Sequence, residues 1–310
     1  MTTPPICDYE GSDYQETFWE QGGRDYEDGA EAVALRRLLP SKGELLLEVG
    51  AGAGRNTPRY GGYGCIVLLD YSVTQLKQAQ ARLGRNARYT YVAADANNLP
   101  FVDGLFDGAT MIRVLHHMAD GPRVLAQIRQ VMQEGGTFIL EYANKRNLKA
   151  IARFILRRQP WNPFDPAPVE FVPLNFNFHP KTTRQWLADA GFTVERQLTV
   201  SHFRVGLLKR LFPTKWLVAA DALASLTGDL WQVSPSVFVK GQAKGTGGRG
   251  DGGTGRRGGA GMGGEGEEGR RGFFKCPQCG GRAFVESETA LHCQGCGVDW
   301  RVEDGVYVFK

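Results

Sequence analysis

The chain has 310 residues, of which 42% are hydrophobic and 23% charged, and its formal net charge is +4. These values are ordinary for a folded α/β domain with a smaller module, and the charge alone does not indicate nucleic-acid binding. No run approaches 18 uncharged apolar residues, and the N-terminus lacks the basic, apolar and small-residue pattern of a signal peptide. We therefore expect a cytoplasmic protein.

The most informative stretch is an apolar strand that runs into a glycine-rich loop at residues 45–55. The strand carries Glu48 near its end, and glycines then alternate with small residues: Gly50, Gly52 and Gly54. Glycines directly after a buried strand let a ligand lie against bare backbone. We expect residues 56–60 to begin a helix whose N–H groups face that ligand.

The spacing of these glycines does not fit a dinucleotide-binding loop. The G-x-G-x-x-G motif needs a third glycine at position 55 or 57, where the chain has Arg55 and Thr57. Glu48, two residues before the first glycine, would serve an anion poorly and an amino group well.

Acidic residues also follow the next two predicted strands. The strand at 65–70 ends in Asp70, and the strand at 89–94 is followed by Asp95 and Ala96. Asp70 stands about 20 residues after the loop, where an acid binds ribose hydroxyls in folds of this type. A fourth strand begins at residue 106 and leads to His116 and His117, and a fifth spans 137–141. The alternation of strands and helices predicts a parallel sheet covered on both faces.

The run E-x-G-x-G-x-G, with the acids at 70 and 95 and the Leu-His-His segment after the fourth strand, resembles the class I S-adenosylmethionine (SAM) methyltransferases, type 11, over roughly residues 40–145. Any one of these acids alone fits the simpler interpretation of a helix cap. The resemblance implies SAM as cofactor and a Rossmann-like, doubly wound α/β fold whose seven-stranded sheet ends in an antiparallel hairpin. It assigns the cofactor to Glu48, Gly50, Gly52, Gly54, Asp70, Asp95 and Ala96, with Asp95 on the adenine amino group.

Residues 1–40 form a polar and aromatic lead segment that ends in a predicted helix, from about 29 to 39. In enzymes of this resemblance such a segment folds over the cofactor, where Arg24 or Tyr26 meets its carboxylate. The alternative is that aromatic side chains such as Phe18 and Trp19 pack the helix onto the sheet. We place the SAM-binding core at 41–145.

Residues 146–240 are predicted to be a substrate-side insert and the last strands of the same domain. Basic residues recur every four positions and predict one helical face: Lys145, Lys149, Arg153 and Arg157. Residues 160–180 are too rich in proline for a regular element. A helix at 181–190, a strand at 192–200, an apolar and basic stretch at 203–227 and a strand at 235–240 follow. The basic, amphipathic segments indicate a lid, a peripheral membrane contact or a solvated face.

Residues 241–272 are half glycine and are predicted to be a flexible linker. Its Arg-Gly runs would touch RNA weakly, but four acids in the segment argue against that as its main role.

Residues 273–310 carry two C-x-x-C pairs: Cys276, Cys279, Cys293 and Cys296. Four thiolates fill a tetrahedral site, so we expect a structural Zn²⁺, or iron in the same geometry, in a zinc ribbon. His292 is expected to be a surface residue. Because of the linker, we expect Cys279→Ser to unfold the ribbon alone.

The ribbon resembles a small zinc-ribbon family that includes an activator subunit of several methyltransferases. It carries four Lys/Arg against five Asp/Glu, which makes it a poor nucleic-acid binder by itself. The resemblance implies protein docking, to its own catalytic domain or to a partner.

Two histidines are the candidate catalytic bases, His117 after the fourth strand and His179 in the insert. Glu141 and Tyr142 come after them. The strand lacks an Asn/Asp-Pro-Pro-aromatic motif, which argues against methylation of the amino groups of adenine, cytosine or glutamine side chains. Three functions stay open: methyl transfer to a small or lipophilic acceptor, methyl transfer to RNA or a translation protein, and SAM binding by a scaffold without turnover.

Overall fold

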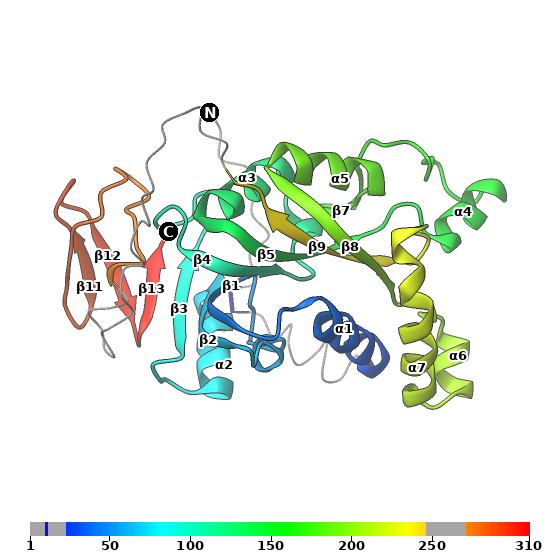
Figure 1. The fold of residues 1–310 in the computed structure, drawn as a ribbon, viewed down its shortest axis with the longest axis horizontal. Helices are drawn as coiled ribbons and strands as arrows, with labels where there is room; N and C mark the ends of the chain where they lie inside the picture. Colours follow the sequence, from blue (N-terminus) through cyan, green and yellow to red (C-terminus); the bar gives the residue numbers. More distant parts are fainter. Residues whose placement is uncertain (1–9, 12–22, 246–270) are drawn as a thin grey trace.

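The computed structural model describes residues 10–11, 23–245 and 271–310. Phe18, Trp19 and most of the predicted linker, residues 246–270, lie outside the described residues. Figure 1 shows a central twisted sheet with helices on both faces, and the C-terminal ribbon at one edge of the sheet. The predicted α/β, Rossmann-like class is confirmed.

The sheet of the core is parallel at its centre and antiparallel at one edge. The strands are β1 (Gly43–Val49), β2 (Tyr63–Asp70), β3 (Tyr89–Ala94), β4 (Phe106–Met111), β5 (Met132–Ala143), β8 (Phe192–Val200) and β9 (Ser236–Ala243). Their order is β3-β2-β1-β4-β5-β9-β8, with β9 antiparallel to β5 and to β8. Chain order reverses between β1 and β4, and in open α/β sheets the ligand crevice lies at this point, beyond the carboxyl ends of the strands.

Two hydrophobic clusters hold helices to opposite faces of the sheet. Alternate residues of β1 supply both: Leu45 and Leu47 point to one cluster and Leu46 to the other. The first cluster includes side chains of α3 (Gly121–Val131) and α5 (Pro180–Asp189). The second includes side chains of α1 (Asp25–Leu38), α2 (Val73–Leu83) and α7 (Thr214–Ala224). The sheet is therefore covered on both faces, as the alternating pattern predicts.

The C-terminal ribbon is part of the core sheet. Its strands are β10 (Phe284–Glu286), β11 (Ala290–Cys293), β12 (Asp299–Glu303) and β13 (Val306–Phe309), paired antiparallel in that order. β13 also pairs in parallel with β3, with Val306 opposite Tyr91 and Phe309 opposite Ala94. The described strands thus form one sheet of eleven, apart from a separate two-stranded hairpin. This pairing argues against a ribbon that unfolds alone.

Aromatic side chains pack at the interface between the ribbon and the core. Phe274 is fully buried and lies 6.1 Å from the ring of Phe101, which precedes β4. The ring of Phe274 also lies 4.8 Å from Tyr307 and 5.0 Å from Phe309, both on β13. Backbone bonds support this contact, since Val102 N donates to the carbonyl of residue 273 at 3.0 Å.

The insert departs from the prediction in two places. Lys145 does not lie on the predicted basic helix: it is buried, and its Nζ donates to the carbonyls of Asp165 and Ala167 at 3.0 and 2.6 Å. The helix α4 (Leu148–Ile155) is shorter, because Asn147 caps its start and Arg157 has a left-handed backbone, φ 56°. The proline-rich stretch does contain a regular element, the hairpin β6 (Val169–Val172) and β7 (Asn175–Asn177).

The remaining helices of the insert lie at the end of the molecule opposite the ribbon. They are α6 (Gly206–Leu211), α7 and the 3₁₀ turn η4 (Ser225–Asp229), and Figure 1 shows α4, α6 and α7 gathered there. No helix within the described ranges has both the length and the hydropathy needed to cross a bilayer.

Candidate functional site

The glycine loop after β1 has the backbone that the sequence predicts but not the helix behind it. Gly50 has φ 70°, and a Cβ there would lie 2.1 Å from Val114 Cγ2, so the loop requires glycine at this position. The predicted helix is only a 3₁₀ turn, η2 (Thr57–Arg59), with Pro58 in its first turn. One loop donor is already used, since Gly52 N donates to Asp70 Oδ2 at 2.8 Å.

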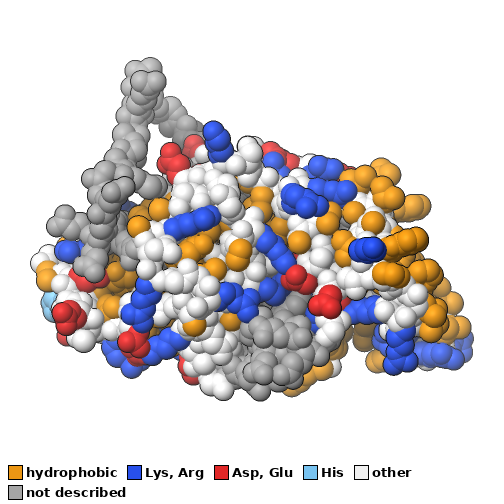
Figure 2. Space-filling view, turned by 90° about the horizontal axis from the view of Figure 1, so that it is seen from below, with side chains coloured by type: hydrophobic (Ala, Val, Ile, Leu, Met, Phe, Trp, Pro, Cys, Tyr) orange, Lys and Arg blue, Asp and Glu red, His pale blue; other side chains and the backbone are white. Residues whose placement is uncertain are grey.

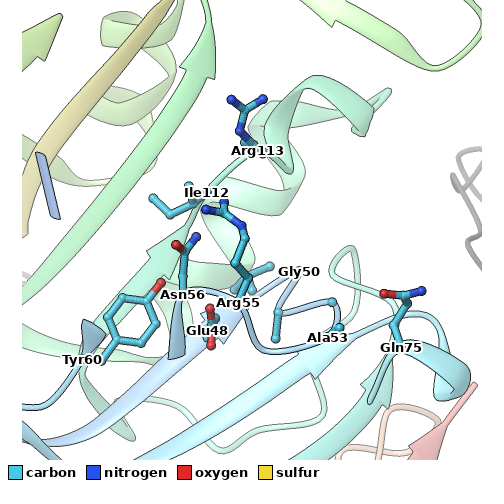
Figure 3. A pocket seen from close by; sticks show the side chains of 12 residues that line it. Glu48, Gly50, Ala53, Arg55, Asn56, Tyr60, Gln75, Ile112 and Arg113 are labelled. Atoms are coloured by element: carbon cyan, nitrogen blue, oxygen red, sulfur yellow. The ribbon is translucent and has the colours of Figure 1, made fainter. Parts of the chain in front are cut away.

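Glu48 lies at the base of a small cavity of about 80 Å³ (Figure 3). The side chain is buried, and its Oε2 accepts a hydrogen bond from Thr57 Oγ1 at 2.6 Å. Burial raises the pKa of Glu48 to about 7. A carboxylate held at such cost of desolvation favours a cationic ligand group, which would restore its charged form. The position fits the amino group inferred from the sequence.

Arg55, the residue that breaks the dinucleotide motif, ties the loop to α1 and to the end of β4. Its guanidinium pairs with Asp28 and, at 2.7 Å, with Glu31. The other carboxylate oxygen of Glu31 accepts from Arg113 Nε at 2.5 Å. Burial alone would raise the pKa of Glu31, but Arg113 and Arg55 outweigh it and hold the pKa below its ordinary value. Figure 3 shows the Arg55 side chain extending towards Ile112 and Arg113.

Asp70 and Asp95 lie at the carboxyl ends of neighbouring strands. Asp70 accepts from Gly52 N through Oδ2 and from Ser72 N through Oδ1, at 2.8 and 2.9 Å, and burial raises its pKa. Asp95 Oδ1 accepts from the backbone and side-chain nitrogens of Asn97, both at 2.8 Å, and Ala96 beside it is buried. Neither acid lines the Glu48 cavity. Asp70 and Asp95 lie at the same edge of the sheet as the cavity, at the carboxyl ends of β2 and β3.

A second, larger cavity of about 610 Å³ lies beyond Arg113. Its walls come from the turn after β4, the end of β5, the start of β9, helix α4 and the β6–β7 hairpin. The hairpin missed by the sequence analysis supplies Phe171, Asn175 and Asn177. Arg113 lines both cavities, so its side chain stands at the boundary between them.

His117 lies in this larger cavity, on the 3₁₀ turn η3 (Leu115–His117). Its Nδ1 is 3.1 Å from the carbonyl oxygen of Leu174, which can only accept, so Nδ1 carries the proton. Nε2 of the neutral ring is then the basic nitrogen. Burial lowers the pKa of His117 and favours this neutral form at pH 7. His116 stacks against it, with ring centroids 4.0 Å apart, and burial lowers its pKa still further.

His179, the other candidate base, lies outside the cavity. It is buried at the start of α5, where its Nδ1 accepts a hydrogen bond from Lys181 N at 3.2 Å. That nitrogen caps a helix, and His179 is not among the residues that line the larger cavity. The geometry therefore favours His117 of the two histidines. Tyr142 is buried in the core and lines neither cavity.

Arg113 and Glu141 form a polar pair on the wall of the larger cavity. Arg113 has φ 60°, an uncommon value for a residue other than glycine, and its N donates to Glu141 Oε2 at 2.9 Å. Glu141 Oε1 accepts from Ser236 Oγ at 2.6 Å, and burial raises the pKa of Glu141. Sequence reasoning missed Arg113, because nothing in the pattern marks its left-handed backbone or its carboxylate partners on α1 and β5.

The four ribbon cysteines converge on one point. Their Sγ atoms all lie within 4.8 Å of one another. The pairs Cys276–Cys296 and Cys279–Cys293 are 3.8 and 3.6 Å apart, near the edge of about 3.8 Å expected for a tetrahedron with Zn–S bonds of about 2.3 Å. The arrangement fits a closed structural Zn²⁺ site. His292, predicted to be a surface residue, is exposed and pairs with Asp299 at 2.7 Å.

Comparison with known proteins finds similarity over part of the chain. Residues 47–140 match the model of a methyltransferase domain. The chain is 34% identical over 151 residues to the O-methyltransferase cnsE of Penicillium expansum, a match that covers 45% of this chain and 54% of that protein. It is 35% identical over 102 residues to a demethylmenaquinone methyltransferase of Corynebacterium kroppenstedtii, covering 33% and 42%. The chain thus spans about half the length of the curated relatives it matches.

Solved structures show the same fold. One is from the complex between the Haloferax volcanii Trm112 methyltransferase activator and a methyltransferase, with a TM-score of 0.54 at 17% identity, covering 75% of this chain and 96% of that one. Another is a SAM-dependent methyltransferase from Mesorhizobium loti, with a TM-score of 0.50 at 21% identity, covering 69% and 97%.

Proposed function

We propose, from the match of residues 47–140 to a methyltransferase domain, that this protein is a class I SAM-dependent methyltransferase that transfers a methyl group from SAM to an oxygen atom of a small acceptor. One observation carries the proposal. The glycine-loop cavity with Glu48 and the larger cavity with His117 share Arg113 as a common wall. With the first cavity as the proposed donor site and the second as the proposed acceptor site, the two would adjoin, as in-line transfer requires.

SAM, when bound, supplies a methyl group on a sulfonium centre, which is a strong electrophile. Glu48 would bind the amino group of SAM. The glycine loop would contact the side of SAM that faces the backbone. Asp70 would bind the ribose hydroxyls, and Asp95 with Ala96 the adenine. The structure fits these roles in that Glu48 is a buried acid whose pKa burial raises to about 7, and in that Asp70 and Asp95 follow neighbouring parallel strands.

His117 is the proposed general base. Its Nε2 would accept the proton of an acceptor hydroxyl, while the Leu174 carbonyl fixes the ring in the required tautomer. Glu141 and Arg113 would orient the acceptor, since both line the cavity and hold each other in place. His179 we now propose to be a capping residue, because its ring bonds to Lys181 N.

A small molecule is the proposed acceptor class. The cavity of about 610 Å³ is of the size that ligand pockets commonly have, and the relatives named above are an O-methyltransferase and a demethylmenaquinone methyltransferase. The ribbon does not by itself favour RNA or a translation protein, because its last strand is already docked on β3. We propose that this docking, with zinc bound, stabilises the catalytic domain of the same chain in the reducing cytoplasm.

The test is transfer of labelled methyl from SAM into a cell lysate separated into small-molecule, protein and RNA fractions. We expect label in the small-molecule fraction, at least about a hundredfold less with His117→Gln, and wild-type labelling with the matched control His292→Gln. Label in RNA or protein would refute the acceptor class. If calorimetry shows SAM binding but no fraction carries label, the result would favour a scaffold protein that binds SAM without turnover.

A further inference from the structure

Exposed large hydrophobic side chains are concentrated in one region of the fold. Among the described residues, all of them except Val285 lie between Leu148 and Trp231. They belong to α4, α6, α7 and η4 with their connections, and to the β6–β7 hairpin. We call this the apolar end surface, defined by Leu148, Ile155, Leu156, Phe164, Phe171, Val172, Val205, Leu207, Leu211, Phe212, Trp216, Leu223, Leu226, Leu230 and Trp231. Figure 2 shows hydrophobic and basic side chains gathered at the end of the molecule that carries these helices.

The helices of this surface turn apolar stripes outward. On α4, Leu148 and Ile155 are seven residues apart and are 64% and 70% exposed; on α7, Trp216 and Leu223 have the same spacing and are 65% and 72% exposed. A spacing of seven places two residues on the same helical face. Packing against the core would bury such a stripe, so these faces are built to meet something outside the described residues.

The charge around the surface specifies its partner. Residues 145–164 and 202–220 contain no Asp or Glu. Exposed Lys and Arg side chains alternate with the apolar ones, and none of these is ion-paired in the part of the chain described here: Lys149, Arg153, Arg157, Arg158, Arg210 and Lys215. The next acid after this second run, Asp221, is buried and bonded to Tyr26 and His202. Apolar anchors within an uncompensated cationic field complement a bilayer of anionic lipid.

We propose that the apolar end surface docks on an anionic lipid bilayer, with α4, α6 and α7 inserting their exposed side chains at the level of the headgroups. Anchoring on the core side is firm: Lys209 of α6 pairs with buried Glu27 of α1 at 2.7 Å. Lys209 and Glu27 hold α6 while its neighbours Leu207 and Leu211 stay exposed.

The surface borders the acceptor cavity. Phe171 of β6 belongs to both, and Lys149 and Arg153, which line the cavity, lie on α4 between the surface residues Leu148 and Ile155. An acceptor dissolved in the bilayer therefore has a short route to His117. This step rests on the proposed function, whereas the lipid contact itself does not.

The experiment is co-sedimentation of the full chain, without SAM, with vesicles of phosphatidylcholine alone or mixed with phosphatidylglycerol, at low and high salt. The variants are Ile155→Glu with Leu223→Glu for the apolar stripes, and Arg210→Glu with Lys215→Glu for the charges. Val285→Glu, an equally apolar and half-exposed position on the ribbon, is the matched control. All these side chains are exposed, and a thermal melt of each variant is the control for folding.

We expect binding to the anionic vesicles that weakens with salt. Arg210→Glu with Lys215→Glu should reduce binding at least about 25-fold, because each lost basic residue accounts for about fivefold. The apolar pair should reduce it at least about tenfold, and Val285→Glu not at all. No binding to anionic vesicles, or equal binding by all variants, overturns the proposal. Self-association in sedimentation velocity that Ile155→Glu with Leu223→Glu abolishes, without vesicle binding, assigns the surface to a second copy instead. Vesicle binding without methyl transfer refutes the proposed function alone.

Discussion

Replacing Phe274 by alanine tests whether ribbon and core form one folding unit. Phe274 is fully buried and contacts three rings, one on the core side and two on β13. Truncating a buried phenylalanine costs about 3–5 kcal/mol. If the two parts are coupled, the whole cooperative unit loses about 4 kcal/mol, a large part of the roughly 5–15 kcal/mol that stabilises a typical domain.

Urea unfolding is the assay, followed by tryptophan fluorescence and by release of zinc to a chromogenic chelator. Coupling predicts that both signals change at the same urea concentration, and that Phe274→Ala lowers both midpoints together. The exposed residue Val285 on β10 gives the control, Val285→Ala, for which we expect less than about 0.5 kcal/mol. Zinc release at lower urea than in the wild type, with an unchanged core transition, would refute the reasoning.

Three further predictions concern the site. If His117 is the base, the rate of methyl transfer should fall at acid pH with an apparent pKa below the ordinary histidine value of 6.5, because burial lowers the pKa of His117. The same fall at acid pH in His117→Gln would contradict this assignment. Asp70→Ala should weaken SAM binding by roughly 10–100-fold in calorimetry, since hydrogen bonds to a charged group are lost, and unchanged affinity would mean that the ribose contact lies elsewhere. Glu48 has a folded pKa of about 7 against an ordinary value of 4.5, so its contribution to stability is complete below about pH 4.5 and is lost as pH rises to 7. The stability of Glu48→Gln relative to the wild type, measured by thermal melting, should therefore rise by up to about 3 kcal/mol between about pH 4.5 and pH 7. A stability difference that stays constant over this range would show that Glu48 does not titrate there.

Residue patterns predicted the parts of the fold that depend on local chemistry. Apolar runs ending in Glu48, Asp70 or the residue before Asp95 predict buried parallel strands, and the structure has β1, β2 and β3 there. The cysteine spacing predicted four sulfurs at one point, because each C-x-x-C is a local turn.

Long-range contacts are what the patterns did not contain. Lys145 has the spacing of a helical stripe, but carbonyls some 20 residues away bind its Nζ. The β6–β7 hairpin forms despite nearby prolines, since the prolines lie outside its paired residues. Arg113 looks ordinary in sequence, and only the approach of Glu31 and Glu141 gives it a position between the two cavities.

The parallel pairing of β13 with β3 has a consequence for biosynthesis. The residues that pair, Tyr91 and Val306, are more than two hundred positions apart, so β3 is translated long before its outer partner. Until then the nascent chain presents an unprotected strand edge, which is a template for intermolecular association. Zinc loading of the ribbon that carries β13 would then determine how long this edge stays open. Zinc-starved cells should accumulate the chain as aggregate rather than as folded apoprotein.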